Sequence, residues 1–387
     1  MVLQIGILAV LVVAAAIGVV NMLSLRSLGD SPRPRRFPMV SVLVPARNEE
    51  ANIGRCIASL VDQDYPNYEI LVLDDNSEDQ TAAIVRGWEQ RSGHVRRIDG
   101  QPLPAGWTGK NFACHQLALE AKGELLLFVD ADTRHSPESV RAGVAALDET
   151  GADLLTVIPN EIMETFWEKV ILPLLHFNLL CFLPLPMVSR TQNPSLAMAN
   201  GQYMLFRRSA YETIGGHHAV QDAIVEDVWL SRLIKRKGFR LRILDGSRVV
   251  ACRMYTSLTG IWHGFSKNLF AGFKFSIPVM AAGVLFHFMT SIFPFLSLAG
   301  ILTGLMNANM LPVVVAQIGV LLFIRGLFSA RFRLNYPAGL LHSLAMFIVI
   351  GMAINSARWI LVAGGSKWKG RAYMYKKRVL ATITGNQ

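Results

Sequence analysis

Long apolar stretches divide the chain from segments in which hydrophobic and polar residues alternate. Residues 1–25 contain no charged side chain, and three further apolar blocks cover 277–304, 310–330 and 337–363. Each stretch is long enough for one helix across a hydrocarbon core about 30 Å thick. The pattern therefore predicts an amino-terminal transmembrane anchor and about three transmembrane helices within 277–365. The alternative for the first stretch is a cleaved signal peptide. Residues 1–25 lack the positively charged start and the A-x-A cleavage site that such a peptide has.

Between the apolar ends, short β-rich runs alternate with amphipathic helical stretches. The helical stretches include Glu49 to Val61 and Asn111 to Lys122. The predicted strands cover 39–44, 69–74, 94–99, 124–130 and 152–158. Strands joined through helices and buried on both faces predict an α/β domain with a mostly parallel, doubly wound sheet. The strand and helix pattern resumes at 201–216 and 225–244, so we place this domain at 38–256.

Two segments are predicted to lie at the membrane surface. Residues 166–188 are apolar but are interrupted by three prolines, and they could form a transmembrane span, a core helix or a surface helix. We favour the surface helix, because a crossing would place the acidic motifs on either side of it on opposite sides of the bilayer. Residues 257–276 are rich in aromatic side chains and predict an amphipathic interfacial helix. A basic tail follows at 366–387.

The distribution of charge narrows the class of partner. The net charge is +10, and residues 246–387 hold 14 basic and no acidic side chains. Most of these basic residues punctuate apolar tracts, which favours a membrane and excludes nucleic acid as the partner. Four arginines follow the first anchor: Arg26, Arg33, Arg35 and Arg36. By the positive-inside rule they predict a multi-pass protein of the cell (inner) membrane whose next domain lies in the cytoplasm. Three further crossings would put the basic tail outside, so the side on which the tail lies stays open.

Acidic residues gather where the predicted strands end. Pro45, Arg47 and Glu49 follow the first strand, and Asp75 follows the second. In parallel sheets, ligands bind at the carboxyl ends of the strands. The loops could equally be helix caps, since acids favour a helix amino terminus.

The fourth predicted strand ends in Asp130-Ala131-Asp132. Alternate residues of an extended segment point to the same side, so these two carboxylates can converge. A cation must then neutralise them, and hard Mg²⁺ or Mn²⁺ suits oxygen ligands and phosphates. The strand ends together predict a site for a metal and a diphosphate.

Two candidate catalytic groups lie further along the chain. Glu226 and Asp227 open a predicted helix, where acids also interact well with the helix dipole. As chemistry, Asp227 could accept a proton from an acceptor hydroxyl. Lys267 is either a snorkelling lysine of the interfacial helix or a cation for a leaving diphosphate.

Five motifs taken in order resemble a known family. They are P-A-R-N-E-E, L-D-D-N-S-E-D-x-T, V-D-A-D, G-Q-Y-M-L-F-R-R with I-G-G, and V-E-D. Residues 38 to about 275 are similar to the GT-A catalytic domain of the inverting glycosyltransferase family two. The amino-terminal anchor, W-H-G-F-S-K-N and the carboxyl-terminal spans look most similar to ceramide-glucosyltransferase-like and hopanoid- or carotenoid-associated enzymes.

The resemblance implies a role for each matching residue. Pro45, Arg47 and Glu49 would border the nucleotide, and Asp75 would meet the uracil or ribose. Lys110 would approach the base or phosphates, and Asp130 would lie near the ribose and sugar. Asp132 would bind the metal, and Asp227 would be the general base. Processive members carry Q-x-x-R-W where this chain has G-F-S-K-N, which argues against a polymerase and leaves Lys267 as a substitute for the missing arginine.

The expected function is transfer of a sugar from a nucleoside diphosphate-sugar to a hydroxyl of a membrane lipid. The resemblance favours a UDP-sugar, with glucose as the sugar. A polyprenyl-phosphate glycosyltransferase is the first alternative. A non-catalytic membrane protein with a degenerate sugar-nucleotide domain is the second.

Overall fold

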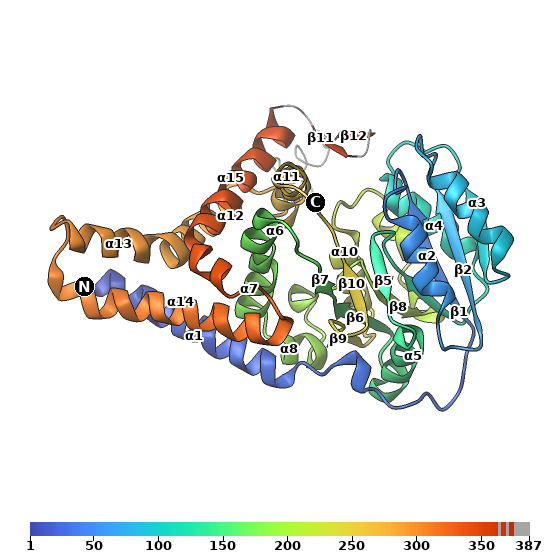
Figure 1. Ribbon diagram of the computed structural model, residues 1–387, viewed down its shortest axis with the longest axis horizontal. Coiled ribbons are helices and arrows are strands. Elements are labelled where there is room, and N and C mark those ends of the chain that lie inside the picture. The colour runs from blue at the N-terminus through green and yellow to red at the C-terminus, as the bar shows by residue number, and fades with distance from the viewer. Residues whose placement is uncertain (363–364, 369–370, 375–387) are drawn as a thin grey trace. The chain divides into compact units, whose positions relative to one another are not determined.

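The chain folds into two compact units. The computed structural model describes residues 1–362, 365–368 and 371–374. The first unit, which we call the helical unit, comprises Met1–Leu23, Met163–Pro184 and the chain from Tyr255 onwards. The second, which we call the sheet unit, comprises Ser24–Ile162 and Leu185–Met254. Figure 1 shows the elements of both units.

The sheet unit is built on a seven-stranded sheet in the order β3-β2-β1-β4-β8-β6-β9. Its strands are β1 (Val40–Ala46), β2 (Tyr68–Asp74), β3 (Val95–Asp99), β4 (Leu125–Phe128), β6 (Leu154–Ile158), β8 (Met204–Arg207) and β9 (Leu241–Asp245). Only β8 runs antiparallel to its neighbours within this sheet. The structure confirms the predicted mostly parallel sheet.

A second, three-stranded sheet has the order β5-β10-β7. Its strands are β5 (Thr133–His135), β10 (Val250–Cys252) and β7 (Asn160–Glu161). These strands have two or three residues each, too few for a period of two to show in the sequence. They had not been predicted.

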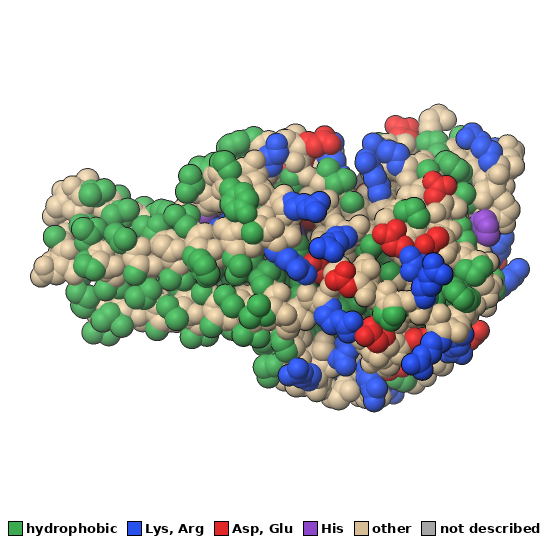
Figure 2. Space-filling view, turned by 60° about the horizontal axis from the view of Figure 1, so that its bottom comes forward, with side chains coloured by type: hydrophobic (Ala, Val, Ile, Leu, Met, Phe, Trp, Pro, Cys, Tyr) green, Lys and Arg blue, Asp and Glu red, His purple; other side chains and the backbone are tan. Residues whose placement is uncertain are grey.

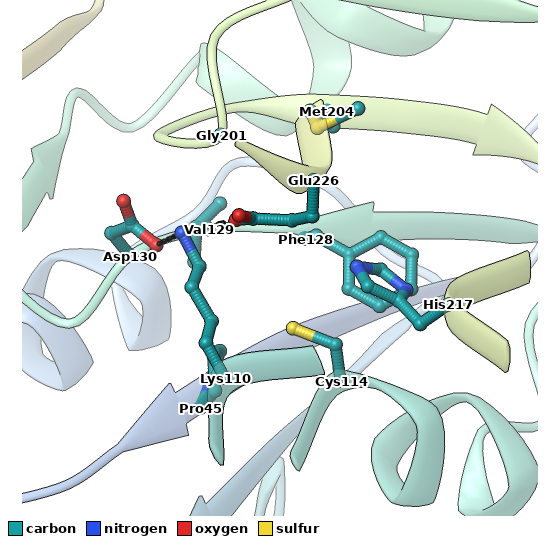
Figure 3. Close-up of a pocket in the computed structure, with 10 residues that line it drawn as sticks. All are labelled: Pro45, Lys110, Cys114, Phe128, Val129, Asp130, Gly201, Met204, His217 and Glu226. Carbon is teal, nitrogen blue, oxygen red and sulfur yellow. Dashed lines mark ion pairs between the residues drawn. The ribbon is translucent and has the colours of Figure 1, made fainter. Parts of the chain in front are cut away.

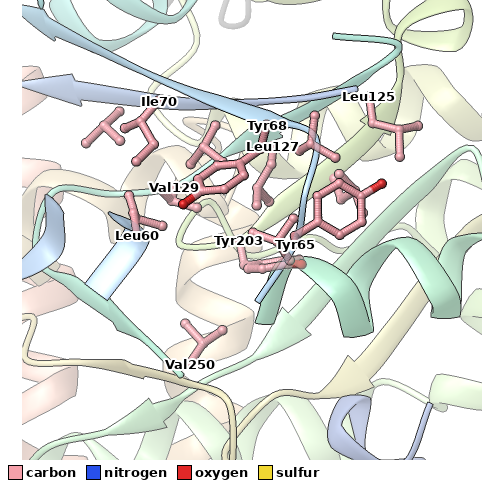
Figure 4. Packing of buried hydrophobic residues seen from close by; sticks show 14 of the residues in the cluster. Leu60, Tyr65, Tyr68, Ile70, Leu125, Leu127, Val129, Tyr203 and Val250 are labelled. Carbon is pink, nitrogen blue, oxygen red and sulfur yellow. The ribbon is translucent and has the colours of Figure 1, made fainter. Parts of the chain in front are cut away.

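Helices cover both faces of the large sheet, as its buried strands require. They are α2 (Ile53–Val61), α3 (Thr81–Arg91), α4 (Gly109–Glu120), α5 (Ser139–Thr150), α8 (Leu185–Arg190), α9 (Arg208–Thr213) and α10 (Glu226–Arg236). Val42 and Val44 enter one buried cluster together with residues of α2 and α5, and Figure 4 shows part of it. Leu43 between them is also fully buried. This double burial explains the continuous apolar run of β1.

The helical unit contains α1 (Val2–Ser24), α6 (Phe166–Ile171), α7 (Pro173–Phe182), α11 (Leu258–Gly272), α12 (Ile277–His287), α13 (Phe293–Leu302), α14 (Leu311–Phe332) and α15 (His342–Leu361). Among the described residues, four helical stretches are long and apolar enough to cross a membrane: Val2–Ser24, Ile277–Leu302, Ala308–Phe332 and Pro337–Leu361. Figure 2 shows that hydrophobic side chains dominate the visible surface of this unit. One amino-terminal and three carboxyl-terminal spans agree with the prediction.

Polar side chains fix α1 inside the helical unit. The Gln4 amide donates to Ser297 Oγ at 2.9 Å, and Gln317 donates to Gln4 Oε1 at 2.9 Å. The Asn21 amide donates to the carbonyls of Leu180 and Leu183, which the end of α7 leaves unpaired. Buried amides of this kind fix one register between apolar helices.

The segment 166–188 forms three short helices instead of one. Thr165 and Glu168 make a capping box at the start of α6, and Pro173 opens α7. On α7, Leu174, Phe177 and Leu180 are buried. The predicted position of this segment at a membrane surface stays a prediction, as does that of residues 257–276, which contain α11.

The carboxyl-terminal end contains a short antiparallel hairpin of β11 (Gly365–Trp368) and β12 (Arg371–Met374). The other residues of the predicted basic tail, 369–370 and 375–387, lie outside the described residues.

Candidate active site

The loops that follow β1 and β2 are tied together at the carboxyl edge of the sheet. Arg47 donates from Nη1 to the carbonyls of Asp75 and Asn76, both at 2.7 Å. The backbone amide of Glu49 donates to Thr81 Oγ1 at 2.7 Å. Arg47 therefore holds Asp75, which is 4% exposed, in a fixed place beside the first loop. The nucleotide-bordering roles of Arg47, Glu49 and Asp75 remain predictions.

A lysine joins two acidic residues from distant parts of the chain. Lys110 Nζ lies 2.6 Å from Asp130 Oδ1 and 2.9 Å from Glu226 Oε1. Lys110 is in the first turn of α4, Asp130 follows β4, and Glu226 begins α10. Figure 3 shows the three side chains converging in one pocket, which Pro45 also lines. Loss of solvent lowers the pKa of Lys110, but Asp130 and Glu226 more than offset this and hold it well above the usual value.

Asp227 lies beside this ion pair and is held by backbone amides. Its Oδ2 accepts from Gly201 at 3.1 Å and its Oδ1 from Val228 at 2.7 Å. Burial, together with the negative charge of Glu226, raises the pKa of Asp227 to about 7. A carboxylate with a pKa near neutrality is suited to take up a proton at physiological pH.

Gly201 leaves the room that this arrangement needs. A Cβ at this position would lie 3.1 Å from Lys110 Nζ and 3.7 Å from Asp227 Oδ2. Any side chain would therefore fill the space between the lysine and the two acids of α10.

Asp132 is buried close to two other acidic side chains, Asp130 and Glu49. Loss of solvent, together with the negative charges of Asp130 and Glu49, raises its pKa to about 7. Its Oδ1 is buried and has no hydrogen-bond partner among the described residues. An unpaired carboxylate oxygen among other acids is a place where a cation would be stabilised.

The residues present fit a divalent cation held together with a phosphate ligand. The described residues contain no group of three or more His, Cys, Asp and Glu side chains that could hold a metal by themselves. Mg²⁺ commonly takes one or two carboxylates and completes its shell with waters and substrate phosphates. Asp132 provides the free oxygen for such a ligand set.

The floor of the pocket is apolar and was not predicted from the sequence. Cys114, Phe128, Met204 and His217 line it. Tyr211 Oη and His217 Nδ1 are 2.7 Å apart, and burial lowers the pKa of His217 to about 3. This histidine is therefore neutral at physiological pH. Met204 is the last residue of G-Q-Y-M and His217 follows I-G-G, so these two motifs were the sequence signals next to them.

The small sheet adds a second set of buried polar groups behind Asp132. Cys252 pairs in register with Glu161 on one side and with Thr133 on the other. Burial raises the pKa of Glu161 to about 8, and the charge of Asp132 contributes. Gln202 Nε2 donates to Cys252 Sγ at 2.8 Å. Gln202 belongs to the motif G-Q-Y-M-L-F-R-R, but the sequence assigned it no role, and it did not single out Glu161 or Cys252.

The structure brings most of the predicted site residues together within the sheet unit. Some of them line one pocket and the others interact electrostatically with those that do. These residues are Pro45, Glu49, Lys110, Asp130, Asp132, Glu226 and Asp227. Asp75 lies within electrostatic reach of Cys114 in the pocket floor. Lys267 belongs to α11 of the helical unit, and its role in the site stays a prediction.

Comparisons with known proteins agree with the motifs. The family model described as glycosyl transferase family 2 matches residues 41–215. The 4,4'-diaponeurosporenoate glycosyltransferase of Staphylococcus aureus (strain MRSA252) is 26% identical over 351 residues, which cover 87% of this chain and 89% of that protein. The protein of the same name from Staphylococcus haemolyticus (strain JCSC1435) is 26% identical over 346 residues, with the same two coverages.

A solved structure shares the fold. The mannosyltransferase PcManGT from Pyrobaculum calidifontis, in complex with GDP-Man and Mn²⁺, superposes with a TM-score of 0.57. The match covers 92% of this chain and 98% of that one, with 17% sequence identity. At this identity the likeness shows the fold alone, and it agrees with the predicted GT-A architecture.

Proposed function

We propose that the protein transfers a sugar from a nucleoside diphosphate-sugar to a membrane lipid. The proposal starts from the match of residues 41–215 to glycosyl transferase family 2. The observation that carries the proposal is the Lys110 bridge between Asp130 and Glu226, with Asp132 and Asp227 beside it. One cation among four carboxylates, at the edge of a sheet where nucleotides bind, suits a diphosphate and a reacting sugar.

The sheet unit supplies the groups that this reaction needs. Asp132 is the residue that would hold Mg²⁺ or Mn²⁺, and such an ion, when bound, neutralises charge on a leaving diphosphate. Lys110 is a second cation in the same pocket, and its two acidic partners fix its position. Preorganised positive charge at a developing anion is commonly the largest single contribution to catalysis.

Asp227 is the proposed general base. It would take the proton of an acceptor hydroxyl, whose oxygen then attacks the anomeric carbon while the bond to the diphosphate breaks. Attack from the face opposite the leaving group inverts the configuration. The backbone amides of Gly201 and Val228 bind both Asp227 oxygens and would orient the carboxylate during this step.

The helical unit supports a lipid as the acceptor. Four candidate membrane spans accompany the sheet unit in the same chain. The Staphylococcus relatives carry the name of a lipid-acceptor enzyme, since 4,4'-diaponeurosporenoate is a carotenoid-like lipid. By resemblance we propose a UDP-sugar as donor, with glucose as the sugar.

An anionic acceptor is the second candidate. The ending of the relatives' acceptor name denotes a carboxylate. A carboxylate or phosphate acceptor is already a nucleophile and needs no base. The two candidates differ in whether Asp227 must accept a proton.

We also propose that the sheet unit faces the cytoplasm. Arg26, Arg33 and the neighbouring arginines follow the first span, Arg331 lies at the end of the third, and Arg333 lies between the last two. Positive residues concentrate on the cytoplasmic side of membrane proteins.

The test is incubation of the purified protein in lipid with labelled sugar nucleotides, followed by extraction into organic solvent and mass analysis. The proposal expects a labelled glycolipid from one donor and none from Lys110→Met. Release of free sugar without any glycolipid, in lipid extracts of several compositions, would contradict it.

A further inference from the structure

The helical unit buries a cation that has no acidic counter-ion. Arg325 lies on the buried face of α14 and is 4% exposed. The chain contains no Asp or Glu after Asp245, so the only acids of this unit are Glu164 and Glu168. Glu168 accepts from the backbone amides at the start of α6. Within the described part of the chain, the buried Nε of Arg325 has no hydrogen-bond partner.

A second set of unused donors faces the same place. His342, at the start of α15, is fully buried and lies within electrostatic reach of Arg325 and His287. Neither ring nitrogen of His342 has a hydrogen-bond partner among the residues that the structure describes. The ring of Phe177 lies 4.7 Å from that of His342, centroid to centroid, at 60°. The arginine and the histidine are thus donors in an apolar surrounding.

The position of these donors along the helices is near one end of the bundle. Arg325 precedes the last residue of α14 by seven positions, which is about 10 Å along an α-helix. His342 is the first residue of α15, and residues 333–341 join the two helices. Gly339 in this connection packs on Arg325, because a Cβ there would lie 3.5 Å from the Cβ of Arg325.

A purely structural arginine would be stabilised differently. Snorkelling would expose the guanidinium at the helix end, whereas Arg325 is almost fully covered. None of the ion pairs among the described residues involves Arg325. Burial of an unpaired charge is costly, so intramembrane charged residues commonly mark a ligand site or a pathway.

We propose that Arg325 and His342 bind the anionic group of a lipid, a carboxylate or a phosphate, inside the helical unit. The ligand would then supply the negative charge that α14 and α15 do not contain. Arg325 would bind the two oxygens with its planar fork, and a His342 N–H would donate to one of them. Phe177 and the neighbouring apolar side chains would surround the start of the acyl or polyene chain. This binding is independent of sugar transfer and of the proposed donor.

The experiment is photolabelling of the full-length protein in phosphatidylcholine nanodiscs. Four diazirine probes with matched chains are compared: a fatty acid, its methyl ester, phosphatidate and diacylglycerol. Hydrogen bonds to charged groups contribute about 1.5–3 kcal/mol, so the two anionic probes should label α14 and α15 peptides about tenfold more than their neutral partners. Stronger labelling by the fatty acid identifies a lipid carboxylate and stronger labelling by phosphatidate a lipid phosphate, and either supports the proposal.

Matched variants separate binding from folding. Arg325→Gln should reduce labelling by the anions to the level of the neutral probes, and Arg325→Lys should retain part of it. Arg331→Gln removes the same charge from an exposed position of the same helix and should label like the wild type. If Arg325→Gln does not fold, two other measurements replace it. The first is labelling of His342→Ala, which should also fall to the level of the neutral probes. The second is the Tm of the wild type, which added fatty acid should raise more than its methyl ester does. Equal labelling by acid and ester, or full labelling of Arg325→Gln, would overturn the proposal.

Discussion

Lys110 Nζ lies 2.6 Å from Asp130 Oδ1, although the two residues belong to a helix and to the loop after a neighbouring strand. The same nitrogen lies 2.9 Å from Glu226 Oε1. One flexible side chain therefore connects β4, α4 and α10 at the edge of the sheet. Without its charge, Asp130 and Glu226 would face each other unneutralised.

Lys110→Met should abolish most of the sugar transfer. Removal of one preorganised electrostatic donor commonly costs about 100- to 1000-fold in kcat, and we expect a loss in this range. The measurement is glycolipid formation at saturating sugar nucleotide. Lys122→Met, an exposed lysine just after α4, is the matched control and should keep wild-type activity. Equal activity of both variants would show that Lys110 is not part of the machinery.

The pH dependence of transfer should follow Asp227. Burial raises the pKa of this carboxyl from 3.8 to about 7, and only the ionised form can accept a proton. The value of kcat/KM should therefore rise about tenfold per pH unit below 7 and level off above it. Asp227→Asn should remove both the activity and this rise. A profile that is flat from pH 5 to 9 (roughly the range of a general-base titration) would favour an acceptor that is already an anion.

The stability of Asp227→Asn provides the control for that measurement. Because the folded pKa lies above the unfolded one, the folded wild type keeps a proton that the unfolded chain loses between about pH 4 and 7. Its stability therefore falls as the pH rises through this window, and a neutral asparagine removes the effect. The variant loses one backbone hydrogen bond, worth about 1 kcal/mol. We expect its Tm at pH 8 to stay close to that of the wild type, so that lost activity cannot be attributed to unfolding.

Sequence reasoning could place the acids at strand ends, because the strands of a doubly wound sheet are apolar on both faces and stop where polar residues begin. It could not place Glu226 against Lys110, since that contact depends on where α10 starts in space. His217 and Glu161 belong to no recognisable motif, and Gly201 was noted only as the start of G-Q-Y-M-L-F-R-R. Their importance comes from close approach or burial, and both depend on neighbours far along the chain.

The segment around Pro173 is a second case in which the sequence pattern did not predict the packing. Its hydrophobicity indicated a membrane-related helix, and its prolines indicated breaks. In the structure, residues 163–184 pack with the candidate membrane spans and not with the sheet. The sequence could not decide this, because hydrophobicity alone does not show which elements an apolar helix packs against.

Metal binding should depend on Asp132. Its unpaired oxygen is the described group best placed to meet a cation, and a diphosphate would complete the ligands. We expect Mn²⁺ to bind in the presence of UDP, measured by electron paramagnetic resonance. It should bind at least about tenfold more weakly to Asp132→Asn, because even the loss of a group that only orients a metal ligand commonly costs about 10- to 100-fold in affinity. Asp62→Asn changes an exposed acid of the same domain and should bind Mn²⁺ normally. Chelation by EDTA should stop transfer, and added Mn²⁺ or Mg²⁺ should restore it. Full activity in EDTA would rule out metal dependence.

Gly201→Ala tests whether the room beside Lys110 is needed. The added methyl group would lie 3.1 Å from Lys110 Nζ and 3.6 Å from Glu226 Oε1, so the lysine must move by a few tenths of an ångström. Small displacements of reacting groups are costly, and we expect kcat/KM to fall by about 10- to 100-fold. The lysine is flexible, so the Tm should change little. Gly93→Ala is the control, because nothing lies within 4 Å of an added Cβ there. If Gly201→Ala were as active as Gly93→Ala, the substrate would not use the space between Lys110 and α10.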